Sequence, residues 1–263
     1  MNAIPLSPAD LAIAAALVVF DAALSLALRL RLHRQVLIAA ARMAAQLVAV
    51  GFILRAVFAL RSPLATLAVV LVMGLVAARE IAARPERKFR GLSGLALSAG
   101  AVAVATTVTA GLALLTAIRP HPWYDPRYAV AIVGIVLGSV LNAGSLTLDS
   151  LVGGAARERA AIEAQLALGA SFRQAMAPLL REAMRRGLLP VVNQMSAAGV
   201  ITLPGIMTGQ ILAGLDPMEA VKYQILLMFL LAGASGLTAV VVGFAALRRL
   251  TDARQRLRLD RLR

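Results

Sequence analysis

The stretch ITLPGIMTGQILAG, residues 201–214, decides how the second half of the chain must fold. It lies among apolar residues, yet it contains one proline, three glycines, two threonines and one glutamine. Hydrocarbon offers no hydrogen-bond partner for a backbone group that a proline or glycine releases from a helix. An interrupted helix inside a membrane is therefore stable only where protein or a water-filled cavity surrounds it. The stretch predicts such a broken, inward-facing membrane helix, with the break at Pro204 and Gly205.

The composition places the whole chain in a membrane. Of its 263 residues, 60% are hydrophobic, and the mean hydropathy is +0.82. A spanning helix needs roughly 20 mostly apolar residues. Stretches of this kind occur at 9–30, 35–60, 63–83, 92–118, 127–151, 187–213 and 219–247. They predict an all-α integral membrane protein with seven transmembrane helices in a single domain, residues 1–263.

The basic residues predict the orientation of these spans. Lys and Arg in short flanking loops stay in the cytoplasm, and most of the 27 in this chain follow the first, third, fifth and last spans. This pattern fits an odd number of spans, with the N-terminus outside and the C-terminus in the cytoplasm. The net charge of +14 therefore reflects topology and attraction to anionic lipid, and we expect no binding to nucleic acid.

Several chemistries are excluded by residue type. The chain has no cysteine, and its two histidines, His33 and His121, lie in loops expected on opposite faces, so we expect no metal site. The loop of the form G-x-x-x-x-G-K-[ST] that binds nucleotide phosphates is missing. We therefore expect no catalytic residues and no cofactor bound by this chain.

Residues 155–186 form the one long polar segment, expected in the cytoplasm, and their pattern indicates two short amphipathic helices. Gly169 is typical of a helix stop, and Ser171 with Gln174 has the spacing of a capping box that starts the next helix. The sequence thus predicts a bent elbow between the fifth and sixth spans, suited to docking in a groove of another protein. A solvated, lipid-facing amphipathic helix is the alternative.

The order Glu163, Ala164, Gly169 resembles the coupling-helix signature of ABC-transporter permeases. With their flanks, four stretches are similar to the FetB (YbbM) family of ABC permeases: ARMAAQLVAVGFIL (41–54), GSVLNAGSLTLDSL (138–151), IEAQLALGAS (162–171) and LLPVVNQMSAAGVITLPGIMTGQILAGLDPMEAVKYQI (188–225). The sequence departs from the family at Ser139, where many members have Asn, so Asn142 alone matches an amide pair at this site.

The resemblance implies an all-helical permease that forms a homodimer and works with a separate ATPase subunit of the FetA type, which binds ATP and Mg. It implies iron export. Plant relatives are linked to aluminium tolerance and one pairing to UDP-glucose, so another metal, a small organic molecule or a nucleotide sugar stays open. From the bend and the resemblance together, the residues expected to contact the ATPase are Glu163, Ala164, Leu168, Gly169, Ala170 and Ser171.

Polar side chains within spans should face each other or a cavity, because an unsatisfied polar group in an apolar medium costs roughly 2–7 kcal/mol. The threonines near the break can return hydrogen bonds to freed carbonyls. Thioethers prefer soft ions, whereas Fe(II) accepts amide and carboxylate oxygens more readily. The expected lining of a substrate pathway is Gln46, Ser139, Asn142, Asn193, Gln194, Met195, Thr202, Met207, Thr208 and Gln210. For each of them, helix packing is the alternative role.

Charged side chains also occur inside apolar runs, where an ionised group costs roughly 2.5–3.5 kcal/mol on insertion scales. We expect Asp21 and Arg42 to pair across the first hairpin. Asp149 lies near the cytoplasmic end of its span. Its side chain can either extend to the membrane surface by snorkelling or admit a cation, and these are its two alternative roles.

A secondary transporter is the competing class of function. It would need a carboxylate near the midplane and an inverted internal repeat, and Asp21 is the one central acid in a chain without a convincing repeat. The chain has no recognisable organellar transit segment, and we expect it in the bacterial inner membrane.

Overall fold

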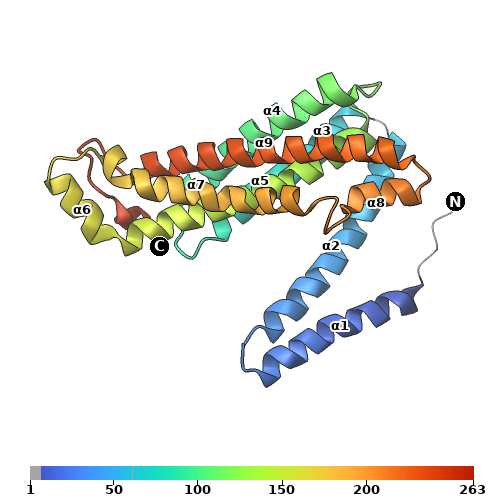
Figure 1. Ribbon diagram of the computed structural model, residues 1–263, viewed down its shortest axis with the longest axis horizontal. Coiled ribbons are helices and arrows are strands. Elements are labelled where there is room, and N and C mark those ends of the chain that lie inside the picture. Colours follow the sequence, from blue (N-terminus) through green and yellow to red (C-terminus); the bar gives the residue numbers. More distant parts are fainter. Residues whose placement is uncertain (1–6, 61) are drawn as a thin grey trace. The chain divides into compact units, whose positions relative to one another are not determined.

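The computed structural model describes residues 7–60 and 62–263 (Figure 1). The expected domain, 1–263, also includes residues 1–6 and 61, which lie outside the described residues. The α-helices in the described ranges are α1 (Pro8–Ala27), α2 (His33–Leu60), α3 (Pro63–Ala83), α4 (Ser93–Leu112), α5 (Pro126–Arg157), α6 (Arg159–Ala167), α7 (Phe172–Ala197), α8 (Gly205–Leu212) and α9 (Pro217–Arg249). A π-helical turn, Ala113–Ile118, continues α4. The all-α fold expected from the sequence is confirmed.

Within the described residues, six helices are long and apolar enough to cross a membrane: α1, α2, α3, α4 with its continuation, α5 and α9. They match six of the seven expected stretches. The other stretch, 187–213, is not one helix, because its first residues belong to the middle of α7 and a break separates them from α8. The basic residues before Gly187 are good helix formers, so the helix continues across the boundary where the apolar pattern begins.

The helices α1 and α2 form a hairpin in one compact unit. A capping box between Ser7 and Asp10 starts α1, because each residue's side chain accepts a hydrogen bond from the backbone N–H of the other. The turn closes where Leu32 donates its N–H to the Ser25 hydroxyl, at 3.0 Å. Whether the whole chain acts as one domain stays a prediction.

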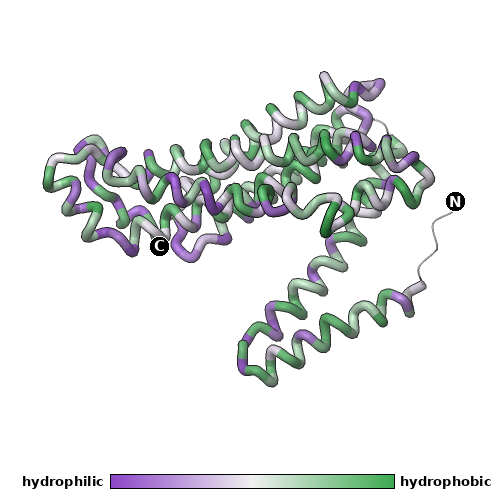
Figure 2. The backbone as a smooth tube through the Cα atoms, viewed as in Figure 1, coloured by the Kyte–Doolittle hydropathy of each residue, from purple (hydrophilic) through white to green (hydrophobic). Residues whose placement is uncertain are grey.

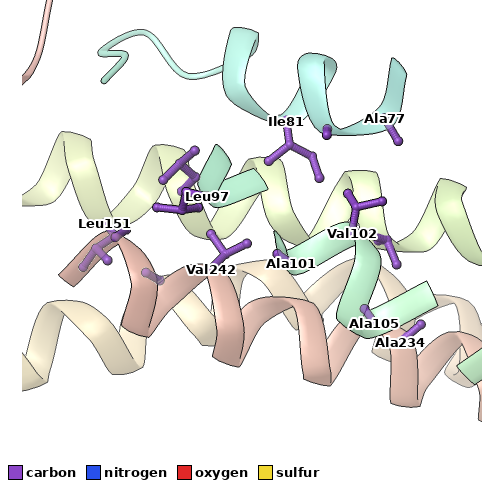
Figure 3. Packing of buried hydrophobic residues seen from close by; sticks show 14 of the residues in the cluster. Ala77, Ile81, Leu97, Ala101, Val102, Ala105, Leu151, Ala234 and Val242 are labelled. Carbon is purple, nitrogen blue, oxygen red and sulfur yellow. The ribbon is translucent and has the colours of Figure 1, made fainter. Parts of the chain in front are cut away.

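The second unit is a helical bundle with α5 at its centre, in contact with α3, α4, α7 and α9. Branched side chains such as Ile81, Leu151 and Val242 fill the space between these helices, and alanines such as Ala101 let the backbones approach closely (Figure 3). Close packing of small residues is the usual source of helix association in membranes.

The helices α5 and α9 run in the same direction. Near the middle of both, Ser139 contacts Ser235, and about one turn later in each helix the backbone of Gly144 lies against Thr238. Later residues of α5 therefore meet later residues of α9.

The helix α7 runs in the opposite direction to both. Near its start, Leu179 lies against Gly154 late in α5, whereas Gly187 lies against Ala143 much earlier in α5. The segment from α6 to α8 thus connects the end of α5 to the start of α9, which lie at opposite ends of this unit.

Three polar, arginine-rich segments meet at one end of this unit (Figure 2): the loop after α3, the region around α6 and the C-terminal tail. The loop after α3 pairs with the C-terminal tail, since Lys88 and Arg263 exchange backbone hydrogen bonds of 3.0 and 2.8 Å. At the same end, Asp149 accepts a hydrogen bond from the backbone N–H of Glu86, at 3.1 Å. Asp149 therefore has a structural contact, and the loop after α3 lies beside the C-terminal tail at this end of the unit.

Candidate functional site

A cavity of about 280 Å³ lies where α5, α7 and α9 meet. Its polar lining comes from Ser139 and Asn142 of α5, Gln194 of α7 and Ser235 of α9. Three of these residues were expected in a pathway from the sequence. Ser235 was not, and the signal that could have found it is a hydroxyl within a long apolar run.

The two serines join α5 to α9 at the wall of this cavity. Their hydroxyl oxygens lie 2.6 Å apart, and the Ser139 hydroxyl lies 3.2 Å from the carbonyl oxygen of Leu231, to which it donates. Because Ser139 has a single proton, Ser235 is the donor between the two hydroxyls.

The cavity sits beside the closest approach of α5 and α7. A Cβ atom on Gly187 would collide with the Thr147 hydroxyl and the Ala143 carbonyl oxygen, so glycine is required at this crossing. One turn further, Pro190 has no N–H, and the carbonyl of Arg186 therefore loses its helical partner. In the cavity wall, α7 therefore packs tightly against α5 at Gly187, whereas at Pro190 one backbone hydrogen bond of the helix is missing.

The amide side chains of Asn142, Asn193 and Gln194 are exposed on the surface of this unit. Asn142 and Gln194 stand where the cavity opens, while Asn193 is adjacent to it in sequence and does not line it. An amide facing hydrocarbon has no hydrogen-bond partner. This face is therefore suited to contact water or another polypeptide rather than lipid.

The helix breaks between α7 and α8, over residues 198–204. Gly199 has φ of +85°, a left-handed conformation that L side chains rarely adopt, and its N–H donates to the carbonyl of Thr202 at 2.9 Å. The break includes the expected Pro204 but begins earlier in the chain, at residue 198. Pro204 ends the unwound segment, since proline disfavours helical geometry in the preceding residue, and Gly205 is already the first residue of α8.

The threonines near the break donate hydrogen bonds to backbone carbonyls, as expected from the sequence. The Thr208 hydroxyl donates to the carbonyl of Pro204 at 3.3 Å, and the Thr202 hydroxyl donates to the carbonyl of Ala197 at 3.4 Å. Both carbonyls also accept a backbone N–H, Pro204 from Thr208 and Ala197 from Ile201, each at 3.0 Å, so the hydroxyls are additional donors and do not replace lost helical partners.

A second cavity, of about 510 Å³, lies beside the break. The expected Met195 and Met207 line it together with Met228 of α9. Gln224 also lines it and is 8% exposed, and its side-chain carbonyl oxygen has no hydrogen-bond partner among the described residues. The buried carbonyl oxygen of Gln210 likewise has no partner in the described part of the chain. Of the two, Gln224 places its unpartnered oxygen at this cavity, whereas Gln210 lines neither cavity.

The remaining expected polar residues belong to the α1–α2 hairpin. Gln46 lies in α2, exposed on the surface of that unit. Asp21 lies in α1 and Arg42 in α2, and their pairing stays a prediction.

The bent elbow predicted from the sequence is present. The short helix α6 ends at Ala167, and the φ of +91° at Gly169 lets the N–H of Ala170 reach the carbonyl of Gln165 at 3.0 Å. Directly after this turn, Ser171 caps α7 through the expected capping box with Gln174. The direction of the chain therefore changes within four residues.

The outer surface of the elbow combines an apolar and a charged group. Leu168 is 88% exposed, whereas Ile162 is buried and anchors α6 to the bundle. Glu163 pairs with Arg159 one turn away, at 2.8 Å, and both side chains remain exposed. The elbow thus presents a free leucine next to an ion pair.

A family profile described as "Uncharacterised protein family (UPF0014)" matches residues 8–251. The chain belongs to the UPF0014 family. Among its UPF0014 relatives, the membrane protein slr1647 of Synechocystis is 39% identical over 229 residues, which cover 87% of each chain. The probable iron export permease protein FetB of Escherichia coli is 30% identical over 264 residues, which cover 100% of this chain and 99% of FetB. The resemblance to the FetB family is therefore confirmed.

A plant UPF0014 relative is also similar over most of its length. Protein ALUMINUM SENSITIVE 3 of Arabidopsis thaliana is 32% identical over 233 residues, which cover 86% of this chain and 82% of the plant protein. No solved structure matches the chain. The membrane-protein relatives and the six apolar helices of the described residues together establish a multi-pass membrane protein.

Among the residues described for this UPF0014 chain, no group of three or more His, Asp or Glu side chains is placed to hold a metal ion. The polar groups that line the two cavities are hydroxyls, amides and thioethers. Such groups suit weak, exchangeable contacts with a passing substrate.

Proposed function

We propose that this chain is the permease subunit of an ABC transporter that exports iron or another metal across the bacterial inner membrane. A separate ATPase subunit of the FetA type would bind ATP and Mg and drive transport, while this chain would act as a transport subunit and not as an enzyme. The choice of metal follows the name of the iron export permease FetB, to which the chain is similar from end to end.

In this proposal the chain crosses the membrane seven times. The parallel directions of α5 and α9 support it, because the segment between two parallel helices must cross the membrane once. The discontinuous pair α7 and α8 is then the sixth crossing and α9 the seventh. The arginine-rich end of the bundle lies in the cytoplasm by the positive-inside rule, so the C-terminus is inside and the N-terminus outside.

The observation that carries the proposal is the elbow at this arginine-rich end. A leucine that is 88% exposed, as Leu168 is, lies on the tip of a bend held by Gly169. A single exposed leucine is common on protein surfaces, so the support comes from its place on the bend together with the end-to-end similarity to the permease FetB. The elbow therefore offers a knob that fits a groove of the ATPase subunit.

The helix α7 links this elbow to the proposed pathway. It runs without interruption from Phe172 at the elbow, past Gln194 at the first cavity, to Ala197 at the break. A continuous helix passes displacement along its axis, so a movement of the elbow reaches the cavity and the unwound segment, with Pro178 and Pro190 as the points at which α7 can bend. ATP-driven motion of the elbow would open and close the polar route through the movement of α7.

A second copy of the chain would complete the route. The exposed amides of Asn142, Asn193 and Gln194 need water or protein around them, and a homodimer that places these faces together would enclose a wet passage. Lipid would then contact the apolar outer faces alone.

One observation favours a different substrate for the same machinery. The cavity beside the break, at about 510 Å³, is larger than a bare metal ion needs and is lined mostly by apolar groups. This lining favours a small organic molecule as the second candidate, with the same ATPase partner, while a nucleotide sugar remains a candidate from the family resemblance alone.

Reconstitution tests both candidates at once. Inside-out vesicles containing this chain and the ATPase subunit should accumulate Fe(II) or another metal when ATP is added, and vesicles lacking either protein should not. ATP-driven uptake of an organic molecule, such as a nucleotide sugar, in place of metals would support the second candidate. Uptake that needs no ATPase subunit would contradict the proposed class.

A further inference from the structure

The C-terminal tail, residues 250–263, is folded against the arginine-rich end of the second unit. Leu250 is completely buried and Leu262 nearly so. Lys88 and Arg263 exchange two backbone hydrogen bonds, which fasten the end of the tail to the loop between α3 and α4. The tail is thus an integral part of this end of the bundle.

The tail also reaches the elbow through one side chain. Gln255 accepts a hydrogen bond from the backbone N–H of Phe172, the first residue of α7, at 2.8 Å. The first N–H groups of a helix have no partner within the helix. The capping box already serves the N–H groups of Ser171 and Gln174, and Gln255 supplies the acceptor for Phe172, one of the two residues between them.

The backbone around Gln255 is shaped to present this side chain. Its φ of +56° is a left-handed conformation that is unfavourable for a residue with a Cβ atom. Asp252 stabilises the turn by accepting the N–H groups of Arg254 and Arg256, at 2.9 and 3.0 Å. Glycine would adopt this turn without strain, but it has no acceptor to offer Phe172.

We propose that Gln255 is a positioning residue for the elbow. By holding the first turn of α7, Gln255 fixes the direction in which α6 projects. Through the tail, it also connects the start of α7 to the loop after α3. The tail thereby makes the α3–α4 loop and the elbow respond as one body to the ATPase subunit. This inference rests on the proposed function for its coupling role, but the contact itself belongs to the chain alone.

Four substitutions separate positioning from folding. Gln255→Met keeps the length of the side chain and removes the acceptor, and Gln255→Gly also removes it but relieves the strained φ. Gln255→Glu keeps an acceptor oxygen at the same distance. Arg254→Ala is the matched control, because Arg254 contributes its backbone N–H to the turn.

The first measurement is hydrogen exchange of the permease alone. Loss of one hydrogen bond should speed exchange at the start of α7 by about five- to tenfold in the Met and Gly variants. The Glu variant and the Arg254→Ala control should exchange like the unaltered chain. Unchanged exchange in the Met and Gly variants would overturn the proposal.

The second measurement is the amount of substrate moved per ATP hydrolysed in vesicles with the ATPase subunit. The ratio should fall at least severalfold for the Met and Gly variants and return to its normal value for the Glu variant. A purely structural role predicts that the unstrained Gly variant couples normally, and that result would overturn the positioning role. Should the unaltered chain show no ATP-driven transport, the proposed function fails, and exchange alone then decides whether Gln255 holds α7.

Discussion

The hydroxyl oxygens of Ser139 and Ser235 lie 2.6 Å apart where α5 meets α9, at the wall of the polar cavity. The proton of Ser139 goes to the carbonyl of Leu231, so the hydrogen-bond chain runs from Ser235 to Ser139 to the backbone. The two parallel helices are therefore joined by a polar contact beside the exposed amides of Asn142 and Gln194.

Replacing Ser235 by alanine should weaken this contact. The loss of one hydroxyl hydrogen bond corresponds to about 1 kcal/mol of stability. Because Ser139 then loses its partner in the cavity wall, we expect the apparent affinity for the transported substrate to fall severalfold. Thermal unfolding and the KM of transport measure the two effects. The control is Ser196→Ala, whose hydroxyl bonds within α7 to the carbonyl of Val192. Equal effects of the two substitutions would show that Ser235 has no specific role in the pathway.

Replacing Gly187 by alanine should separate α5 from α7. The added Cβ would collide with Thr147 and with the backbone of Ala143, and overpacking of this kind costs about 1–3 kcal/mol. Gly138→Ala is the matched control, since Gly138 lines the same cavity and has open space at its Cβ position. Thermal unfolding should show a lower midpoint for the Gly187 variant alone.

Changes at the elbow should uncouple ATP hydrolysis from transport without preventing insertion. Gly169→Leu forces a side chain into a φ of +91°, and Glu163→Arg breaks the ion pair with Arg159. Gly169→Asn should be milder, because asparagine tolerates left-handed backbone better than leucine. Transport per ATP hydrolysed is the measurement, with membrane yield as the control. Normal coupling in both Gly169→Leu and Glu163→Arg would exclude the elbow as the coupling element.

The predicted pair of Asp21 and Arg42 can be tested by rescue. An ionised group without a partner in a span costs roughly 2.5–3.5 kcal/mol, so Asp21→Asn or Arg42→Gln alone should lower the yield of folded protein. The double variant should restore most of it. A double variant no better than the worse single one would show that the two residues do not interact.

The tail should stay folded in mildly acidic solution and loosen at low pH. The backbone N–H and then the guanidinium of Arg256 hold the pKa of Asp252 well below its usual range. The guanidinium of Arg258 lowers the pKa of Asp260 to about 2. Because both pKa values are depressed on folding, the stabilisation is complete above the unfolded value of roughly 3.9 and is lost as the pH falls through the folded values.

A fluorophore on Arg254→Cys would report this change, because the chain has no cysteine of its own. Its signal should be constant between about pH 7 and 5 and should shift as the pH falls from about 4 to 2. A transition centred near neutral pH would contradict the assignment to these two carboxylates.

The sequence predicts the elbow well because its rules are local. Gly169, Ser171 and Gln174 lie within six residues, and a helix stop followed by a capping box needs no distant partner. The sequence also predicts the break after α7, and Pro204 lies within it. Its start at residue 198 could not be predicted, since Gly199 and Pro204 both interrupt helices and the apolar pattern does not show which of them begins the break.

Contacts between distant residues were beyond the sequence. Ser235 is one hydroxyl in an apolar run, and its pairing with Ser139 depends on the parallel crossing of α5 and α9. The contact of Gln255 with Phe172 spans 83 positions and depends on how the tail folds back. Periodicity predicts which face of a helix is apolar, but it does not predict which helix will cover that face.

The central proposal is that the elbow docks into an ATPase subunit in the cytoplasm, and a single thiol tests it most directly. Leu168→Cys places one cysteine at the tip of the elbow in a chain that otherwise has none. We predict that a short bifunctional reagent links it to the ATPase subunit and stops ATP-driven transport, whereas Trp123→Cys, exposed between α4 and α5 at the opposite end of the bundle, is not linked. No link from Leu168→Cys, or a link from Trp123→Cys instead, would contradict it.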